Sequence, residues 1–378
     1  MTRVGGPWLS DPGAQAVCAL LTNAGHQAWF VGGCVRNALL GAPVSDLDIS
    51  TDARPERVTA LAEAAGMKAV PTGIDHGTVT IVHGGQPFEI TTFRRDVETD
   101  GRHAVVAFAE TLEEDARRRD FTMNALYADA AGAVRDPVGG LVDLAERRFR
   151  FIGDAEARIR EDYLRILRFF RFFAWYGTDL DPEGLAACAA HGDGLATLSA
   201  ERVTGEVTKL LSAPEPARAV AALEQAGLLA RVLPGASAKP LGPFTHLDPV
   251  TPVDPMARLA ALGGDATGLR LSKAEARGLA IYREIMEGAD GAGALGHGHG
   301  AEIAQRGLAL RAAALEAPLD PAEIAAAARG AAADFPVRAA DLPADLEGPA
   351  IGEALTRLKT AWIASDFSAT RAELLAQL

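Results

Sequence analysis

The stretch VGGCVRNALLGAPVSDLDIS, residues 31–50, decides the fold of the N-terminal part of this chain. The apolar run over residues 28–31 predicts a buried strand that ends at a pair of glycines. A short helix is expected over residues 35–40 and a second strand over residues 44–51. A strand, a glycine turn, a helix and a strand in this order predict a mixed α/β domain.

Two features of this stretch point to phosphate chemistry. Asp46 and Asp48 stand at positions i and i+2 of the expected strand, which would place both carboxylates on one face, where they can share Mg²⁺. Gly32 and Gly33 allow a triphosphate to approach the backbone at a helix N-terminus, and Arg36 adds a cation one turn into that helix. Carboxylates for a metal ion beside an anion site are what phosphoryl transfer requires.

The combination resembles the nucleotidyltransferase superfamily that includes DNA polymerase β. A Rossmann dinucleotide site fits less well, because the two adjacent glycines lack the third, spaced glycine of that fingerprint. Further blocks follow in order along the chain: EITTFR at 89–94, EDARRRDFTMNAL at 114–126, EDYLR at 161–165 and SAER at 199–202.

Together these blocks resemble the ordered motifs of class II tRNA nucleotidyltransferases, the bacterial CCA-adding enzymes, and their poly(A) polymerase relatives. The resemblance covers about residues 27–235, and no motif is matched from about residue 240 onward. It implies an α+β fold, in which an N-terminal polymerase β-like head with a mixed sheet precedes an all-α neck, body and tail. The predicted boundaries are 1–140 for the catalytic head, 141–213 for the neck that recognises the base and RNA, 214–262 for the body and 263–378 for a tail that contacts tRNA.

The residue pattern beyond Leu141 agrees with a helical second half, because strand signals nearly vanish there. Helices are expected over 155–176, 182–190, 200–211, 216–226, 273–287, 301–315, 321–332 and 351–365. Residues 233–255, rich in Pro and Gly, are expected to form a linker, and the Gly-rich segment 288–300 a flexible loop. Residues 95–108 are expected to form a loop near the site.

The resemblance assigns roles to individual residues. By position, Gly32, Gly33 and Arg36 would bind the triphosphate, Asp46 and Asp48 would bind Mg²⁺, Arg119 would contact the nucleotide, and Asp162 and Arg165 would read the incoming base with Arg168 and Arg171 nearby. Glu89 is either a third carboxylate that helps to deprotonate the attacking 3′-hydroxyl or an ordinary surface glutamate. The family usually has Asp where this chain has Asn37, a departure that spares the metal pair.

The base-reading pair also follows from chemistry. Asp162 and Arg165 are i and i+3 on the expected helix and would be neighbours on one face. Cytosine and adenine both present an amine donor beside a ring-nitrogen acceptor, so a carboxylate next to a guanidinium accepts them and rejects uracil and guanine. Arg168 and Arg171 lie among apolar residues and must be paired or bind an anion, and internal salt bridges to head carboxylates are the alternative.

The net charge first argues against a nucleic-acid partner. The chain has 37 Lys and Arg against 50 Asp and Glu, a formal charge of −13. The segment from Arg94 to Arg171, however, holds 15 arginines and 16 acidic residues, so nearly all the excess acidity lies elsewhere. Because arginine suits bidentate phosphate and base contacts, this segment leaves RNA binding open.

The cysteine and apolar patterns restrict the cellular setting. Cys18, Cys34 and Cys188 lie far apart, which predicts neither a disulfide framework nor a cysteine zinc site and fits a reducing cytoplasm. No apolar run reaches about 18 residues, so we expect a soluble cytoplasmic protein without a membrane partner.

The leading hypothesis is therefore template-independent addition of C, C and A to the tRNA 3′ end from CTP and ATP, with Mg²⁺ in a two-metal mechanism and release of pyrophosphate. The expected partners are tRNA and these nucleotides, not DNA, and the oligomeric state stays open. Poly(A) polymerase, or addition of only A or only CC, are alternatives with the same motifs. The stretch IVHGGQPF at 81–88 lacks the basic residues usual in poly(A) polymerases, which favours the tRNA enzyme. A catalytically inactive RNA-binding protein is the alternative from another class, and the intact Asp46 and Asp48 argue against it.

Overall fold

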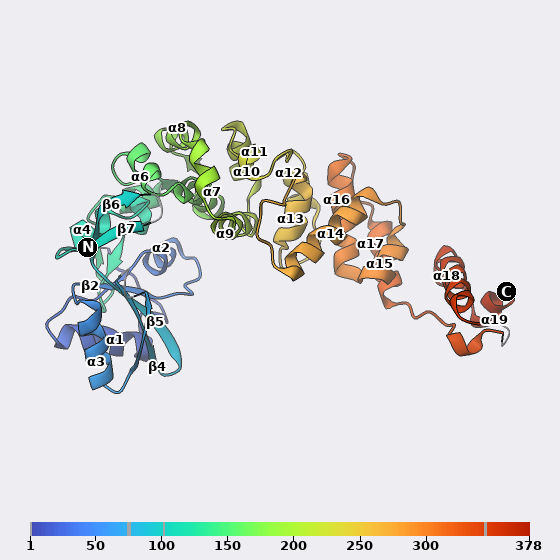
Figure 1. The fold of residues 1–378 in the computed structure, drawn as a ribbon, viewed down its shortest axis with the longest axis horizontal. Coiled ribbons are helices and arrows are strands. Elements are labelled where there is room, and N and C mark those ends of the chain that lie inside the picture. Colours follow the sequence, from blue (N-terminus) through green and yellow to red (C-terminus); the bar gives the residue numbers. More distant parts are fainter. Residues whose placement is uncertain (1, 74–76, 101–102, 344–345) are drawn as a thin grey trace. The chain divides into compact units, whose positions relative to one another are not determined.

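The structure is a computed structural model that describes residues 2–73, 77–100, 103–343 and 346–378 and is drawn in Figure 1. The chain forms two compact units. The first comprises Met1–Arg202 with Ala226–Arg231, and the second comprises Val203–Gln225 with Val232–Leu378. The finer division into head, neck, body and tail stays a prediction.

The first unit is built on a seven-stranded mixed sheet in the order β3-β4-β5-β2-β1-β8-β9. Its strands are β1 (Trp29–Val31), β2 (Asp48–Thr51), β3 (Lys68–Gly73), β4 (Thr78–His83), β5 (Gln86–Thr92), β8 (Tyr127–Ala128) and β9 (Val134–Arg135). Neighbouring strands are antiparallel except β2 and β5, which run parallel. The predicted mixed-sheet head is confirmed.

Helices α1 (Pro12–Asn23), α2 (Gly33–Leu40) and α3 (Pro55–Ala64) contact strands of this sheet. The next helices along the chain are α4 (Leu112–Arg117) and α5 (Gly140–Ala145). Helices α1 and α3 contact each other and strands β4 and β5 (Figure 1). Helix α1 begins where the Asp11 carboxylate accepts a hydrogen bond from the Ala14 amide at 2.8 Å, and its buried stripe includes Val17 and Leu21. Helix α2 ends at Gly41 in the left-handed conformation, φ 69°, as its glycine predicts.

The prediction of a loop over residues 95–108 is wrong for the residues of that segment that the structure describes. Strand β6 (Arg94–Asp100) pairs antiparallel with β7 (His103–Phe108) in a separate two-stranded sheet. Gly101, on which the loop prediction partly relied, lies outside the described residues. The run HAVVAF contains two adjacent valines, whose β-branched side chains favour extended backbone over a loop.

The rest of the first unit is mainly helical. Its elements are the short helix η2 (Thr122–Asn124), β10 (Arg148–Phe149), α6 (Ala155–Glu161), α7 (Leu164–Tyr176), β11 (Asp179–Leu180), α8 (Pro182–Ala190), η3 (Gly192–Thr197) and the start of α9 (Ala200–Leu211). The single helix expected over 155–176 is two helices, because Asp162 leaves the helical conformation with φ −156°. Its carboxylate then accepts a hydrogen bond from the Leu164 amide at 3.1 Å and caps α7.

The remaining elements are helices. They are α10 (Ala217–Gln225), α11 (Leu229–Val232), α12 (Leu241–Leu247), α13 (Pro255–Leu262), α14 (Lys273–Glu287), α15 (Ala292–His299), α16 (Ala301–Ala314), α17 (Pro321–Ala332), η4 (Ala339–Asp341), α18 (Pro349–Ala364) and α19 (Arg371–Leu375). The linker expected over 233–255 is wrong, since it contains α12 with Leu241 and Phe244 fully buried. Pro240 and Pro243 flank or open this helix, where proline is tolerated because those amides have no partner within the helix. Within the described residues, no helix has the length and apolarity needed to cross a membrane.

The loop expected over 288–300 is also wrong, and close packing explains why a helix forms there. Helix α15 lies beside α17 in Figure 1 and the two backbones nearly touch. A Cβ atom at Gly296 would lie 1.9 Å from the carbonyl oxygen of Ala327, and one at Gly330 would lie 2.1 Å from that of Gly293. The glycines are therefore present for the approach of two helices, although glycine usually weakens a helix.

This packing predicts opposite effects for two glycines of the same helix. Gly296→Ala should lower the free energy of unfolding by about 1–3 kcal/mol, because its methyl group must push α17 away. Gly298→Ala is the matched control, since a Cβ there meets no atom within 4 Å and alanine favours the helix by up to about 1 kcal/mol. Urea unfolding of both variants measures this, and equal stabilities would contradict the helix contact.

Candidate nucleotide site

Two of the predicted carboxylates are neighbours at the centre of the sheet. Asp48 begins β2 and lies directly opposite Glu89 of β5 in the parallel register. Asp46 lies two residues before the strand, so the expectation that it stands on the strand itself is wrong. The side chain of Asp46 accepts a hydrogen bond from the Ser45 hydroxyl at 3.1 Å.

The electrostatics of these carboxylates suit a cation. Partial desolvation, followed by repulsion from Glu89 and Asp46, raises the pKa of Asp48, whereas Arg119 opposes this rise. A divalent ion would relieve the repulsion, and two carboxylates leave coordination positions for water and phosphate oxygens, as Mg²⁺ prefers. Within the described part of the chain, no group of three or more His, Cys, Asp or Glu side chains is arranged to hold a metal ion. With Asp46 and Asp48 as the predicted ligands, other oxygen ligands would have to complete the coordination.

The glycine turn before α2 lies beside two arginines. Gly32 has φ 72° and stands at the N-cap of α2, which has no side-chain cap on its first amides. A Cβ atom at Gly32 would lie 3.7 Å from Nη1 of Arg119, and one at Gly33 would lie 3.9 Å from Nη2 of Arg36. Backbone amides and two guanidinium groups therefore meet at one turn, an arrangement suited to an anion.

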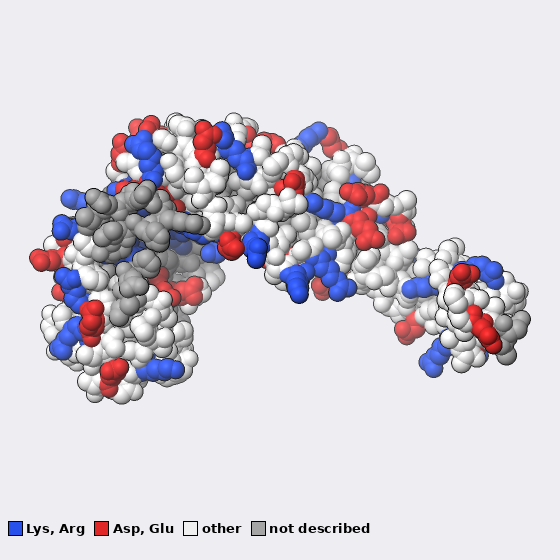
Figure 2. Space-filling view, in the orientation of Figure 1, with Lys and Arg blue, Asp and Glu red and all other residues white. Residues whose placement is uncertain are grey.

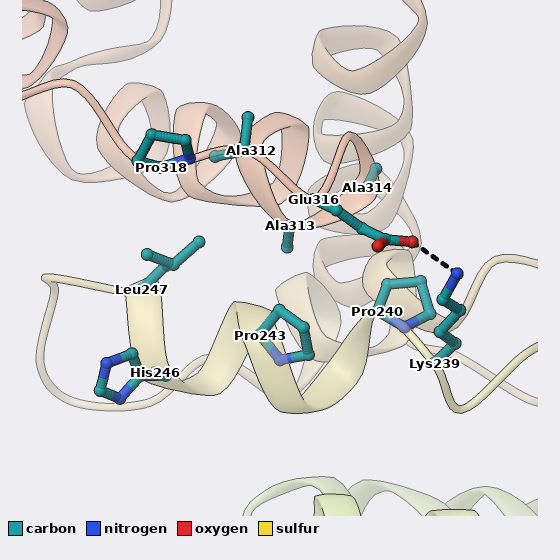
Figure 3. A pocket seen from close by; sticks show the side chains of 11 residues that line it. Lys239, Pro240, Pro243, His246, Leu247, Ala312, Ala313, Ala314, Glu316 and Pro318 are labelled. Carbon is teal, nitrogen blue, oxygen red and sulfur yellow. Dashed lines mark ion pairs between the residues drawn. The ribbon is translucent and has the colours of Figure 1, made fainter.

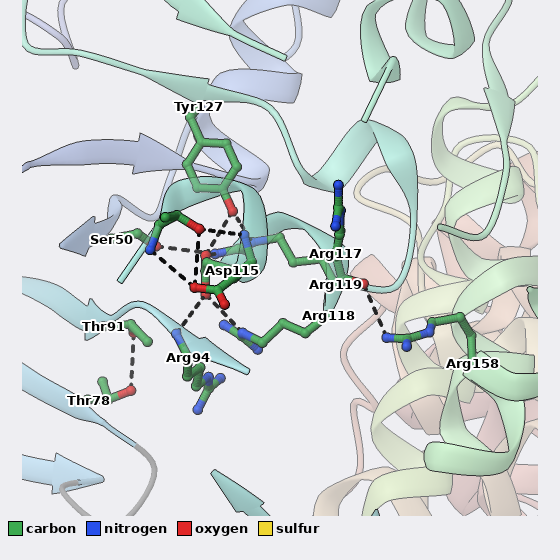
Figure 4. Close-up of polar contacts among 12 residues, drawn as sticks. Ser50, Thr78, Thr91, Arg94, Asp115, Arg117, Arg118, Arg119, Tyr127 and Arg158 are labelled. Carbon is green, nitrogen blue, oxygen red and sulfur yellow. Dashed lines mark hydrogen bonds and ion pairs between the residues drawn. The ribbon is translucent and has the colours of Figure 1, made fainter. Parts of the chain in front are cut away.

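Arg119 is held in place by a buried hydrogen-bond network, shown in Figure 4. Its Nε donates to the Tyr127 hydroxyl at 3.1 Å, and its Nη2 donates to Ser50 at 3.3 Å and to the Asp115 carboxylate at 3.1 Å. Ser50 belongs to β2, the strand of Asp48. The network therefore fixes Arg119 between the glycine turn and the carboxylates.

Asp115 is the centre of this network, and the sequence interpretation gave it no role. It is fully buried, accepts from Tyr127 at 2.8 Å and pairs with Arg118 at 2.9 Å. Burial alone would raise its pKa, but Arg119 and Arg118 hold the pKa of Asp115 at about 2. The available signal was spacing, because Asp115 stands three and four residues before these arginines at the end of α4.

Arg36 is almost completely buried, at 6% exposure, between α2 and α7. Its guanidinium carbon lies 4.5 Å from the ring centroid of Tyr176 and 5.0 Å from that of Phe172. Arg36, which is predicted to bind the triphosphate, is therefore a buried side chain held between aromatic rings and not an exposed surface arginine.

The backbone amide of Arg165 donates to the carbonyl oxygen of Asp162 at 3.0 Å, but the side chains of these two residues bind other partners. Asp162 ends α6 and pairs with Arg202 at 2.7 Å. Arg165, in the first turn of α7, pairs with Glu161 and donates to the carbonyl oxygens of Arg158 at 2.7 Å and Arg118 at 3.3 Å. The expectation that the two stand on one helix is wrong, because the break at Asp162 separates them.

Many arginines of the segment 94–171 are neutralised within the protein. Arg168 pairs with Asp120 at 2.5 Å. For Arg168 the structure therefore contains the internal salt bridge to a head carboxylate that was the alternative to binding an anion. The guanidinium carbon of Arg171 lies 3.9 Å from the ring centroid of Phe172. Other ion-paired arginines of the segment are Arg118, Arg119, Arg148, Arg150, Arg158, Arg160 and Arg165. Figure 2 shows both signs of charge interspersed on the visible surface of each unit.

A separate pocket of about 510 Å³ lies within the second unit and is shown in Figure 3. It is lined by Lys239, Pro240, Pro243, His246, Leu247, Ala312, Ala313, Ala314, Glu316, Ala317 and Pro318. Lys239 and Glu316 form an exposed ion pair at this pocket, and most other lining groups are apolar. None of the predicted site residues contributes to it.

Comparison with known proteins shows which families this chain resembles. Residues 28–150 match the model of the poly A polymerase head domain, and residues 177–239 match that of a probable RNA- and SrmB-binding site of polymerase A. A CCA-adding enzyme of Geobacillus thermodenitrificans is 42% identical over 228 residues, which cover 60% of this chain and 55% of the relative. A CCA-adding enzyme of Streptococcus pyogenes is 43% identical over 56% of this chain and 52% of the relative. The chain thus matches about half the length of these curated relatives.

Solved structures extend the likeness over nearly the whole chain. The crystal structure of the Bacillus stearothermophilus CCA-adding enzyme in complex with CTP superimposes with a TM-score of 0.77 and 32% identity, covering 96% of this chain and 94% of that chain. A Thermotoga maritima CCA-adding enzyme complexed with tRNA has the same fold, with a TM-score of 0.72, 17% identity and coverage of 100% and 98%. The chain belongs to the family of class II CCA-adding enzymes and poly(A) polymerases. Nucleotidyltransferases of this family generally use a divalent metal ion.

The low pKa of Asp115 predicts a defined pH dependence. Its folded-state pKa of about 2 lies below the ordinary value of 3.8, so its contribution of about 2 kcal/mol is present above pH 4 and is lost as the pH falls toward 2. Asp115→Asn should therefore be less stable than the wild type at pH 7, and the gap should narrow between pH 4 and pH 2. Chemical unfolding across this range measures the gap, with the exposed neighbour variant Glu113→Gln as control. A gap that stays constant with pH would contradict the assignment.

Proposed function

We propose that the protein adds C, C and A to the 3′ end of tRNA from CTP and ATP, without a nucleic-acid template, and releases pyrophosphate. The observation that carries the proposal is that the Gly32 turn, Arg119 and Asp48 lie together at one end of the adjacent inner strands β1 and β2. The 32% identity to a CCA-adding enzyme solved with CTP, across 94% of that chain, supports the same reaction class.

Each group of the site has a proposed task. Asp46 and Asp48 would hold Mg²⁺, which when bound neutralises charge on the attacking and leaving oxygens. Gly32, Gly33 and Arg36 would bind the triphosphate, and Arg119 would contact the nucleotide from its fixed position.

Glu89 is proposed as the acceptor of the proton that leaves the RNA 3′-hydroxyl. Its position opposite Asp48 in the parallel register supports this task rather than that of an unrelated surface glutamate.

Base choice is proposed to rest on Asp162 and Arg165, with Arg168 and Arg171 nearby. Asp162 would accept from the exocyclic amine of cytosine or adenine, and Arg165 would donate to the ring nitrogen. In the present structure Asp162 forms an ion pair with Arg202, and Arg165 forms one with Glu161. A base that binds to Asp162 and Arg165 would therefore replace these two protein partners.

The proposed substrates also imply the setting. Because tRNA, CTP and ATP meet in the cytoplasm of bacteria, we infer that the protein acts there, and tRNA is its proposed macromolecular partner. Poly(A) synthesis is a second candidate, since the head matches a poly A polymerase model, and the assay below separates the two.

The decisive measurement is incorporation of labelled CTP and ATP, with Mg²⁺, into tRNA transcripts that end at the discriminator base, at C or at CC. We expect each transcript to be completed to CCA and then left unextended. Asp46→Ala with Asp48→Ala should lower the rate at least about 1,000-fold, because the electrostatic stabilisation of the reacting phosphate is lost. The exposed strand variant Asp179→Asn should retain activity. Long A tails, no incorporation, or an active double variant would refute the proposal.

A second prediction concerns nucleotide choice. Asp162→Ala should raise the incorporation of UTP and GTP relative to CTP and ATP by about 5- to 150-fold, corresponding to about 1–3 kcal/mol for one lost polar match. Glu156→Gln, on the same helix α6, removes another carboxylate and serves as the control. Unchanged selectivity in Asp162→Ala, measured with single-nucleotide additions, would refute the role of Asp162 as a protein template.

A further inference from the structure

Three of the arginines predicted to bind the nucleotide meet at one aromatic ring, that of Phe172 in α7. Their guanidinium carbons lie 3.9 Å (Arg171), 5.0 Å (Arg36) and 5.2 Å (Arg168) from the centroid of this ring. At each of these distances an aromatic ring attracts a cation. Arg168 and Arg171 belong to α7 itself, whereas Arg36 comes from α2, so the ring joins two helices of the first unit.

The ring of Phe172 is held in place by other aromatic side chains. It is 4% exposed and stacks on Phe149, with the ring centroids 5.2 Å apart and the planes inclined by 9°. The ring of Phe121 meets it edge to face, with the centroids 5.5 Å apart. Because both of these partners are buried, Phe172 offers the three cations a surface with a fixed position.

The cations around this ring repel one another. Burial lowers the pKa of Arg36, Tyr176 opposes this change, and the nearby Arg171 lowers the pKa further. A guanidinium group nevertheless keeps its proton in proteins, so positive charge accumulates around the ring. The carboxylate of Asp120 accepts from Nε of Arg168 at 2.7 Å and offsets the charge of that arginine.

Contact with a ring face differs from an ion pair in what it leaves for a ligand. The negative face of a benzene ring attracts a guanidinium group without accepting any of its N–H bonds. A carboxylate, in contrast, accepts those bonds in the same geometry that a phosphate would use. Phe172 therefore holds positive charge in place without cancelling it.

This cationic group lies next to the glycine turn before α2. A Cβ atom at Gly33 would lie 3.9 Å from Nη2 of Arg36, the arginine of the group that α2 carries. The first amides of α2 have no side-chain cap and also favour an anion. An anion with several charged oxygens suits the turn and the adjoining cationic group together.

We propose that Phe172 is a positioning residue for nucleotide binding, because its ring face keeps Arg36, Arg168 and Arg171 together as a preformed cationic group for a polyphosphate. The inference rests on the proposed function for the identity of the anion. The ligand class is a polyphosphate chain. A ring of the same shape without a negative face would preserve the fold but would no longer hold the three cations together.

The sharpest test changes the charge distribution of this ring and keeps its shape. Fluorine atoms on the outer edge of a phenylalanine ring withdraw electrons and remove most of the negative face. Phe172→trifluorophenylalanine should therefore weaken the binding of inorganic tripolyphosphate about 3- to 30-fold, as expected for the loss of a desolvated cation–ring contact. Titration calorimetry measures this affinity, with EDTA present so that no divalent ion contributes.

Phe169 provides the matched control on the same helix. It is fully buried, and its ring contacts are with Phe121, Phe151 and Phe170. Phe169→trifluorophenylalanine should bind tripolyphosphate within about twofold of the wild type. Phe172→Leu and Phe169→Leu should lower the free energy of unfolding in urea by similar amounts, because each loses a buried ring. Of these two, only Phe172→Leu should weaken tripolyphosphate binding.

The affinities distinguish a positioning role from a packing role. A loss confined to the variants of Phe172 supports the proposal. An unchanged affinity in Phe172→trifluorophenylalanine, or equal losses in the variants of Phe172 and Phe169, would overturn it, since packing alone would then explain the ring.

Failure of the proposed function would give a different result. Tripolyphosphate has neither base nor ribose, so the predicted order of affinities supports the role of Phe172 even if no nucleotide is added to tRNA, in which case only the proposed function fails. A wild-type protein that binds no tripolyphosphate overturns the role of Phe172, whatever the incorporation assay gives.

Discussion

The parallel pairing of β2 with β5 is the constraint on which the candidate site depends. It sets Asp48 beside Glu89 in a sheet whose other pairings are antiparallel, and it brings like charges together at the centre of the sheet. Such a pair requires positive charge nearby. Arg119 supplies part of it, because Ser50 of the same strand and the buried Asp115 fix its guanidinium group. The glycine turn before α2 lies next to the guanidinium group of Arg119.

Much of the head could be predicted from its sequence, because its signals are local. A glycine pair after an apolar run indicated the turn, and residues 44–51 were expected to form the strand that carries Asp48. The family resemblance predicted roles for Arg36, Arg119 and Asp162, but it gave none to Asp115. Local sequence patterns did not predict which residue each charged side chain pairs with. The pairing of Arg168 with Asp120, 48 residues apart, depends on how α7 packs against the head, and no spacing rule contains that contact.

The errors have physical causes of the same kind. Asp46 fell outside its expected strand because strand ends depend on hydrogen bonds to neighbouring strands rather than on residue type. The apolar periodicity predicted one continuous helix over residues 155–176, but Asp162 interrupts it because its side chain accepts a hydrogen bond from the first turn of the following helix. The Gly-rich segment near residue 296 was taken for a loop, since propensity counts the entropy cost of glycine but not the close contact between backbones that glycine permits.

The contact between α15 and α17 also limits how this part of the chain can change over evolutionary time. Alanine and glycine lose almost no side-chain rotamer freedom on folding, so the two helices associate with little entropic cost of that kind. At Gly296 and Gly330, however, every other amino acid is larger than the resident one. Mutational drift at these positions therefore has one direction only, toward enlargement, and the two helices must change together or not at all.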